Sequence, residues 1–250
     1  MSGFIKYAAV CGIINALTAC GGDSDPTPTA QSCFDSSTYT PGTVINQRYT
    51  STSTPSNVFN MTIEPLNQKA EFNNTSGLMP IKRRVYTEIP IQDSLESYQE
   101  TVYIEPVTSL EVIEHGYERS TATGVWRMED LWINNPPVKD KKFTLKAGES
   151  FEYQTVARVT RNFPEAIKHD PLAEGTSDIH YNIKTTFSGV EEIKIGSRTV
   201  KACKFKTKSL DAPLDDSSDW FYRGILIQRT DPYGKISMET LEFTRNGQNY

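Results

Sequence analysis

The sequence predicts an all-β fold in which antiparallel strands supply most of the structure. Short runs of β-branched and aromatic residues recur along the chain, and clusters of Pro, Gly, Asn and Asp separate them at intervals typical of antiparallel sheets. Apolar residues at helical spacing are nearly absent. The hydrophobic fraction of 37% and the charged fraction of 23% are ordinary for a globular protein. The composition therefore does not distinguish a binding protein from an enzyme.

The first element is a short apolar segment at the amino terminus. Lys6 provides a positive charge, residues 7–17 form an apolar run, and Leu17-Thr18-Ala19-Cys20 closes it. These are the three regions of a secretory signal peptide. The apolar run is about half of the roughly 20 residues that a membrane-spanning helix needs, so we expect it to be cleaved. An ordinary secreted protein, cut at the same place, is the alternative.

The cysteine directly after this cut resembles the lipid-attachment site of bacterial lipoproteins. The resemblance implies that residues 1–19 are a lipoprotein signal peptide, and that Cys20 receives a diacylglyceryl group on its sulfur and an acyl group on the new amino terminus. Several acyl chains make an anchor effectively permanent. In Gram-negative lipoproteins an aspartate at the next position usually means retention in the inner membrane, and here that position is Gly21. We therefore expect an outer-membrane protein facing the periplasm; the inner membrane and the cell surface stay open.

A polar stretch follows the expected anchor. Residues 20–32 carry two prolines and no apolar periodicity, which predicts a lipidated flexible tether with a reach of about 3 Å per residue where it is extended. No further linker or internal repeat follows. We therefore expect residues 33–250 to form a single β-rich periplasmic domain, which the tether holds away from the lipid headgroups.

Two of the four cysteines remain for this domain. Cys11 lies within the signal peptide and Cys20 is assigned to lipid. Cys33 and Cys203 form an even pair in an oxidising compartment, so we predict a disulfide between them. In the chain-entropy model, closing a loop of about 170 residues contributes at most roughly 5 kcal/mol. Two buried free thiols are the alternative.

The candidate strands in the first half of the domain are short and rich in β-branched and aromatic residues. They are residues 44–49, 58–63, 84–89, 101–104 and 110–113. Residues 94–100 and 164–168 are the candidates for one or two helical turns each.

The most detailed tertiary prediction is a hairpin about Gly196-Ser197, a two-residue turn suited to type II′. Folding there predicts four opposed pairs, which agree in polarity: Ile193 with Val200, Glu192 with Lys201, Lys194 with Thr199, and Val190 with Cys203. Val200 and Cys203 have opposite parity along their strand. Either a bulge separates them, or both faces of the sheet are partly covered.

The C-terminal quarter resembles bacterial envelope lipoproteins of largely uncharacterised function. The similarity lies in residues 189–196 and 202–205, which would be paired strands, and in residues 219–225, which would be the strand that follows. Many such proteins are half-open barrels, in which a curved antiparallel sheet surrounds an apolar cavity, as in lipoprotein carriers. The fold that we predict is therefore a curved antiparallel sheet, as a half-barrel or a sandwich, with few short helical turns.

The charge pattern argues against nucleic-acid binding. The chain carries 31 acidic and 26 basic residues, for a net charge of −5, and it has no strong basic field. Residues 82–84 and 139–142 are short basic patches, which we interpret as solvated faces rather than phosphate sites. We predict no nucleic-acid partner.

Catalytic and metal-binding motifs are absent from the sequence. The histidines His115, His169 and His180 are scattered, and no paired ligand spacing accompanies them. No nucleophile elbow, P-loop or dinucleotide fingerprint occurs. A set of carboxylates could supply an acid/base pair, although surface charge is the simpler interpretation: Glu111, Glu114, Glu129 and Asp130. We predict no catalytic residues, no cofactor and no metal.

The aromatic pairs have two readings. Trp126 and Trp132 would share a face of one unbroken strand, as would Trp220 and Tyr222. Exposed pairs would be platforms for sugars, whereas buried pairs would be core anchors, and we favour burial.

These observations lead to two hypotheses of different classes. The first is a lipid-anchored envelope lipoprotein with a non-catalytic role, whose β domain binds an apolar or glycan ligand or a protein. The second is a lipid-tethered hydrolase that acts on cell-wall glycan or peptide through carboxylates brought together by folding. Both are attached to the membrane through Cys20.

Overall fold

The structure is a computed structural model, and it describes residues 27–51, 58–88, 95–123, 127–163, 175–211 and 216–249. The signal peptide, Cys20 and the first part of the tether lie outside these residues. The described chain is almost entirely strand, as the sequence predicts. The strands are β1 (Ile45–Ser51), β2 (Val58–Pro65), β3 (Ala70–Phe72), β4 (Thr75–Thr87), β5 (Leu95–Pro106), β6 (Val112–Thr123), β7 (Arg127–Asp140), β8 (Ser150–Asn162), β9 (Gly175–Ile195), β10 (Arg198–Ser209), β11 (Ser217–Tyr222), β12 (Ile225–Thr230), β13 (Ile236–Arg245) and β14 (Gln248–Asn249).

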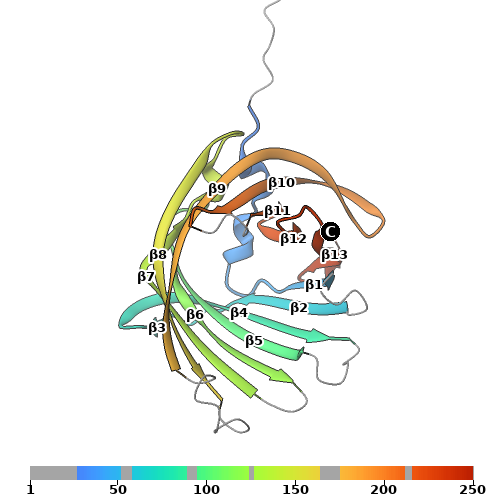
Figure 1. Cartoon of the computed structure of the whole chain (residues 1–250). Helices are drawn as coiled ribbons and strands as arrows, with labels where there is room; N and C mark the ends of the chain where they lie inside the picture. The colour runs from blue at the N-terminus through green and yellow to red at the C-terminus, as the bar shows by residue number, and fades with distance from the viewer. Residues whose placement is uncertain are drawn as a thin grey trace, which may run out of the picture.

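Twelve of these strands close into an antiparallel barrel, which Figure 1 shows as a ring of arrows. Each strand pairs with the next in the order β1-β2-β4-β5-β6-β7-β8-β9-β10-β11-β12-β13, and β13 pairs with β1 from Ile45↔Arg245 to Ser51↔Met238. The curved antiparallel sheet is confirmed, but the half-barrel and the sandwich are not. The sheet closes because the first and last long strands, about 200 residues apart, satisfy each other's edges.

Three short 3-10 helices accompany the strands: η1 (Ala30–Cys33), η2 (Ser36–Tyr39) and η3 (Lys142–Thr144). None of them falls where helical turns were expected. Residues 95–100 belong instead to β5, where Tyr98 and Glu100 take their places in the alternation of the strand. Residues 164–168 lie outside the described part of the chain.

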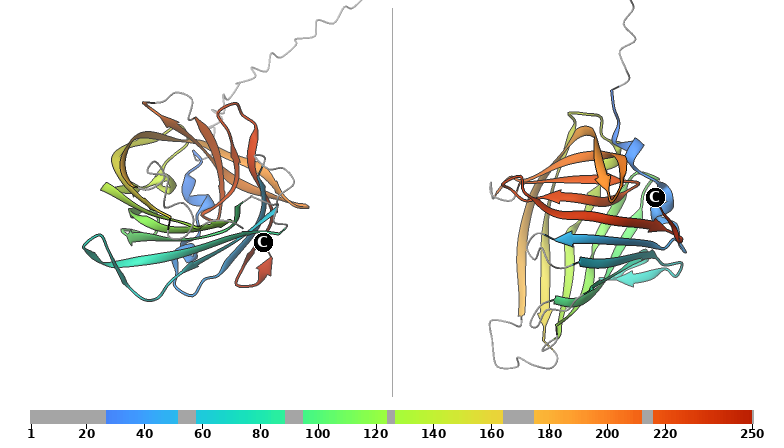
Figure 2. Two further views of the ribbon diagram at one scale, coloured as in Figure 1. Left: turned by 60° about the horizontal axis from the view of Figure 1, so that its bottom comes forward. Right: turned by 90° about the vertical axis from the view of Figure 1, so that its right-hand side faces the viewer.

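The amino-terminal segment forms a plug, defined here as residues 29–40, which lies inside the barrel. Figure 1 shows this blue segment within the outline of the ring of strands, and the right-hand view of Figure 2 shows it at one end of the barrel. Thr29 forms a β-bridge with Lys146, and the Ala30 amide donates to Leu145 O over 2.9 Å. The folded structure therefore begins within the predicted tether, four residues before Cys33.

The predicted hairpin about Gly196-Ser197 is confirmed, with all four opposed pairs in register between β9 and β10. Gly196 has a φ of 57°, whereas Ser197 does not have a positive φ, as a type II′ turn requires. The bulge lies between Lys204 and Phe205, beyond Cys203. Val200 and Cys203 therefore face opposite sides of a sheet that is covered on both faces.

Apolar side chains cover both faces of the barrel wall. Inside, one cluster surrounds Ile81 and Val102, and another surrounds the plug. The opposite face of β10 and β11 carries a third cluster with Ala202 and Trp220, and β3 covers a fourth around Leu78. The wall is close-packed between β6 and β7, where a Cβ at Gly116 would lie 2.0 Å from Trp132 O.

Candidate functional site

The inner face of the barrel carries charged and aromatic side chains in addition to its apolar cluster. Successive side chains of a strand point to opposite faces. Arg83 therefore lies on the same face of β4 as Ile81, and Glu100 on the same face of β5 as Val102. Polar groups thus reach the interior at ordinary alternating positions.

Two adjoining cavities remain inside the barrel. We call the one beside Trp132 the aromatic compartment, with a volume of about 480 Å³, and the one beside Arg83 the arginine compartment, with a volume of about 630 Å³. Tyr39 of the plug and Phe143 of η3 contribute to the wall of the arginine compartment. Five residues line both compartments: Glu114, Asp140, Lys142, Phe221 and Arg229. These shared residues, most of them charged, form the boundary between the two compartments, and the cavity continues past them.

One carboxylate in the arginine compartment is held by two guanidinium groups. Glu100 is buried, and its oxygens accept from Arg83 Nη1 at 3.0 Å and from Arg119 Nη2 at 2.6 Å. Burial alone would lower the pKa of Arg83, but the carboxylates of Glu100 and Glu114 outweigh it and raise that pKa. Both arginines therefore remain charged beside the cavity. The side chain of Arg83 is still 41% accessible, although it lies within the barrel.

Two further ion pairs lie at the boundary between the compartments. Lys142 Nζ is 2.7 Å from Asp140 Oδ2, and Arg229 Nε is 2.7 Å from Asp219 Oδ1. Burial lowers the pKa of Lys142, but Asp140 more than compensates, so the net shift is upward. The Lys142 ammonium also lies 4.7 Å from the ring centroid of Phe221, within cation–π range.

Glu114 differs from the other carboxylates of the cavity. Among the described residues its side chain forms no ion pair, whereas Glu100, Asp140 and Asp219 each have one. Burial raises the pKa of Glu114, and the nearby charge of Arg83 only partly offsets that effect. The site therefore contains one carboxyl group that is poised to be neutral or to accept a positive partner.

Aromatic rings form much of the remaining wall. Tyr117 stacks on Trp132 with ring centroids 5.2 Å apart, and the Arg119 guanidinium lies 4.8 Å from the Tyr117 centroid. Tyr153 and Tyr181 line the same aromatic compartment. Burial raises the pKa of Tyr153 to about 12, so this phenol is neutral and can donate a hydrogen bond at physiological pH.

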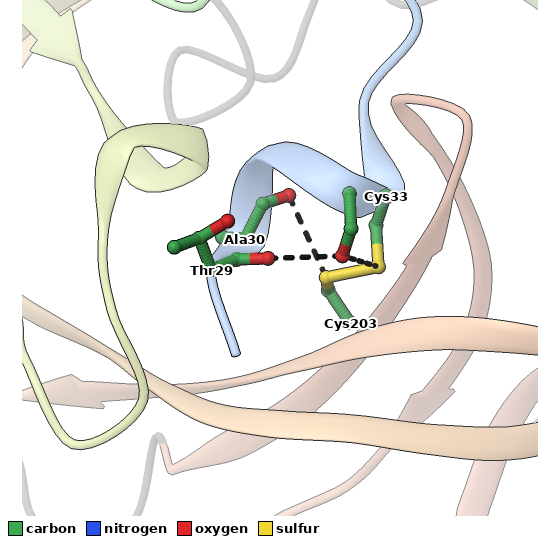
Figure 3. Close-up of a disulfide and its surroundings, with 5 residues drawn as sticks. Thr29, Ala30, Cys33 and Cys203 are labelled. Carbon is green, nitrogen blue, oxygen red and sulfur yellow. Dashed lines mark hydrogen bonds between the residues drawn. A yellow bond between two sulfur atoms is a disulfide. The ribbon is translucent and has the colours of Figure 1, made fainter. Parts of the chain in front are cut away.

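A disulfide fixes the plug to the barrel wall. Cys33 in η1 is bonded to Cys203 in β10, as predicted, and their Cα atoms are 5.7 Å apart (Figure 3). Both cysteines are buried in an apolar cluster that includes Phe187 and Phe205. The Ala30 carbonyl oxygen lies 3.6 Å from Cys203 Sγ. The disulfide therefore lies in an apolar core beside the cavity.

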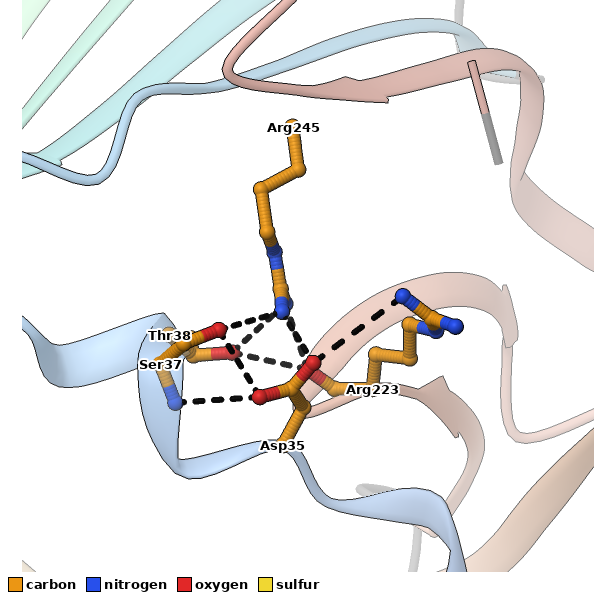
Figure 4. A network of polar contacts seen from close by, with 5 residues as sticks. All are labelled: Asp35, Ser37, Thr38, Arg223 and Arg245. Atoms are coloured by element: carbon orange, nitrogen blue, oxygen red, sulfur yellow. Dashed lines mark hydrogen bonds and ion pairs between the residues drawn. The ribbon is translucent and has the colours of Figure 1, made fainter. Parts of the chain in front are cut away.

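A buried arginine holds the other end of the plug. Figure 4 shows Arg245 of β13 reaching three residues of the plug. Its Nη1 atom contacts Asp35 and donates to Ser37 Oγ over 2.7 Å, and its Nη2 atom donates to Thr38 Oγ1 over 2.9 Å. Burial alone would raise the pKa of Asp35, but hydrogen bonds from Ser37 and the charge of Arg245 lower it.

The four acidic candidates from the sequence do not come together. Glu114 lines both compartments, but Glu111 pairs with Lys139 at 3.1 Å, and Glu129 pairs with Arg127 at 3.2 Å. Asp130 is buried and pairs with Arg161 at 2.9 Å. Only Glu114 is therefore part of the candidate site.

The aromatic and histidine candidates have mixed outcomes. Trp220 is 6% exposed and packs with Tyr222 in the third apolar cluster, so it is a core anchor as favoured. Trp132 lines the cavity, whereas Trp126 and His169 lie outside the described residues. His115 lies 3.7 Å from Glu105, and His180 is exposed on β9.

The basic patches were misread, because one residue of each is directed inward. Arg83 from residues 82–84 and Lys142 from residues 139–142 line the cavity instead of a solvated face. Arg83 lies on the inner face of β4, where alternation places it, and Lys142 begins η3 just after β7 ends. Alternation of Arg83 with the apolar Ile81 and Val85 is the sequence signal that could have indicated this position.

Comparison with family models, curated proteins and solved structures finds no match to this chain. Across the described ranges, no group of three or more His, Cys, Asp and Glu side chains could hold a metal ion. No helix in that part of the chain has the length and apolar character needed to cross a membrane.

Proposed function

We propose that this protein is a lipid-anchored envelope lipoprotein whose barrel binds a ligand without transforming it. Cys20 carries the acyl groups and attaches the protein to the outer membrane, on the periplasmic side. The support for this address is the signal-peptide pattern that ends in Leu17-Thr18-Ala19-Cys20. The Cys33–Cys203 disulfide supports an oxidising compartment.

The observation that carries the binding role is the cavity itself. Ligand pockets in proteins usually have volumes of about 300–1,000 Å³, with apolar and aromatic walls and a few placed polar groups. The compartments of 480 and 630 Å³ fall in that range, and their walls combine aromatic rings with ion-paired charges. Such a wall suits a small molecule with both apolar and polar parts better than a purely apolar lipid.

Native mass spectrometry of the full chain, extracted in detergent from its own host, tests the binding role. We expect a small molecule to remain bound to the wild-type protein. Thr207→Trp should displace it, because Thr207 lines the aromatic compartment. Lys206→Trp is the matched control, since Lys206 is exposed on the opposite face of the same strand. A wild-type protein that carries no ligand, even after incubation with a host metabolite extract, would contradict the proposal.

Labelling and fractionation test the anchor separately. Cells that produce the wild type are labelled with palmitate, and we expect the label on the protein and the protein in the outer-membrane fraction. Cys20→Ser should abolish both and release the protein to the soluble fraction. An unlabelled wild type in the osmotic-shock fluid would refute the anchor and leave the binding role untouched.

A hydrolase is the second candidate, and one pair of carboxyl groups favours it. Glu114 and Asp140 line the same cavity from paired strands, and Val112, two residues before Glu114, is the register partner of Asp140. Burial raises the pKa of Glu114, while Asp140 is paired with Lys142. Such unequal environments can separate a general acid from a base. Release of soluble fragments from purified sacculi by the wild type, but not by Asp140→Asn, would establish this activity over binding.

A further inference from the structure

The ion pairs of the cavity leave one charge unmatched in the aromatic compartment. Three carboxylates line that compartment, and two of them, Asp140 and Asp219, have Lys142 and Arg229 as partners at 2.7 Å. Glu114 has no ion-pair partner among the described residues. An ionised Glu114 therefore gives this compartment an excess of one negative charge.

The two arginines of the arginine compartment already have an ion-pair partner. Arg83 and Arg119 both bind Glu100, at 3.0 and 2.6 Å, and the Arg119 guanidinium also covers Tyr98 and Tyr117 at 5.4 and 4.8 Å. An anionic ligand would have to compete with a buried carboxylate for these groups. At Glu114 a cationic ligand meets the positive charges of Arg83 and Lys142 nearby, but these groups form their ion pairs with Glu100 and Asp140.

Aromatic side chains line the compartment that contains the Glu114 carboxyl group. Trp132, Tyr153 and Tyr181 line the same compartment as Glu114. The faces of such rings attract cations, most strongly when water is excluded, and cages of this kind bind quaternary ammonium groups. The barrel already uses this contact internally, since Lys142 lies against Phe221.

We propose that the aromatic compartment binds an organic cation, an amine or a quaternary ammonium compound, with Glu114 as its counter-ion. The inference rests on the proposed binding function and specifies its ligand class. The cation sits between the Glu114 carboxylate and the tyrosine and tryptophan rings. The compartment has a volume of about 480 Å³ in all, which leaves room for an apolar or aromatic portion attached to the positive group.

Titration with choline tests the ligand class directly. Choline is added to the full-length protein in detergent and binding is followed by calorimetry, in parallel with its uncharged isostere, in which a tert-butyl group replaces trimethylammonium. The wild type should bind choline at least about tenfold more tightly than the isostere, as expected for a desolvated cation–π site with a counter-ion. Equal affinity for the two compounds would overturn the proposal.

Isosteric variants then assign the counter-ion. Glu114→Gln should weaken choline binding about tenfold or more and leave binding of the isostere unchanged, while Glu114→Asp should keep part of the preference. Glu152→Gln is the matched control, because Glu152 is 53% exposed on the other face of β8 and pairs with Lys184. Undiminished choline binding by a folded Glu114→Gln would also overturn it.

The results separate this inference from the proposed function. Binding of the isostere as tightly as choline, or a neutral or anionic molecule found by native mass spectrometry, would refute the cation and keep the binding protein. Absence of every ligand, from the titrations and from the extracted protein alike, would refute both.

Discussion

The plugged end of the barrel and the cavity beside it are built from different kinds of contact. Around Cys33 of the plug, buried phenylalanines pack against a disulfide, with Phe187 and Phe205 at 0% exposure, and the Asp35–Arg245 ion pair holds the other end of the plug. Across the cavity, three carboxylates are ion-paired to lysine and arginine, and aromatic rings border open volume. Close packing stabilises a fold, whereas a ligand site needs open volume and polar groups that are available to contact the ligand. Within the barrel, the packed region around the plug therefore stabilises the fold, and the cavity beside it is suited to binding.

Breaking the disulfide should have the largest effect on this comparison. The double variant Cys33→Ser/Cys203→Ser releases the plug from β10 across a sequence separation of 170. Chain entropy assigns such a loop about 5 kcal/mol, as an upper figure, so the free energy of unfolding should fall by about 3–5 kcal/mol. Urea unfolding of the variant and of the wild type measures the difference. A change below about 1 kcal/mol would mean that the plug is held mainly by its other contacts.

Two truncations on one strand contrast the regions directly. Phe187 and Tyr181 lie on the same face of β9, one in the plug core and the other beside the cavity. Phe187→Ala should reduce the free energy of unfolding by about 4 kcal/mol, because it leaves a cavity in a packed core. Tyr181→Ala should reduce it by about 1 kcal/mol, because its ring already borders open space. Equal losses in urea unfolding would show that the two regions are packed alike.

Removal of the shared carboxylate should destabilise the charged region. Glu100→Gln removes the ion-pair partner of Arg83 and Arg119, and leaves Arg83 with Glu114 as a nearby negative charge. Breaking a buried ion pair by deleting one partner typically costs about 3–5 kcal/mol, and access of water to Arg83 should reduce this to about 2 kcal/mol. Thermal unfolding at low and high salt checks the prediction. Stability equal to the wild type would indicate that Glu100 is dispensable for the barrel.

The smallest effect concerns Glu114 and depends on pH. Arg83, Glu100, Asp140 and Lys142 surround this group, and burial makes the largest contribution to its raised pKa. The folded protein therefore holds the proton more tightly than the unfolded chain. Stability from this group is present below the unfolded pKa of about 4.3 and is lost as pH rises through the higher folded value.

Glu114→Gln should remove that pH-dependent loss. The variant should be slightly more stable than the wild type at pH 7, by about 1 kcal/mol or less, with the difference shrinking toward pH 4. Urea unfolding across this pH range provides the measurement, and Glu152→Gln again serves as the control. A variant that is less stable at pH 7 would mean that ionised Glu114 is satisfied within the barrel.

Local sequence patterns located parts of four strands in the first half of the domain and one hairpin, whereas residues 110–111 of the fifth candidate strand precede β6. The pairing of Ile193 with Val200 and of Glu192 with Lys201 follows from a two-residue turn and the period of a strand, which are short-range constraints. The Cys33–Cys203 bond followed from counting thiols in an oxidising compartment. Local patterns also misled, since residues 95–100 lie in β5 rather than in a helical turn.

The candidate site could not be predicted in this way. Glu114 was one of four acidic candidates that were more simply interpreted as surface charge, and Arg83 and Lys142 were interpreted as parts of solvated patches. Whether a strand position faces water or a lumen depends on the partner strands, and those are distant in sequence. The same alternation that puts Ile81 in the apolar cluster puts Arg83 beside the cavity.

The sequence alone therefore determined the strand content, the local hairpin register and the availability of one cysteine pair, because neighbouring residues carry those signals. Only the tertiary structure decided that β1 closes on β13, that residues 29–40 enter the barrel, and which charges face inward. Closure depends on hydrogen bonds between chain ends about 200 residues apart. Because the sheet closes, alternate side chains of each strand face either the lumen or the outside of the barrel.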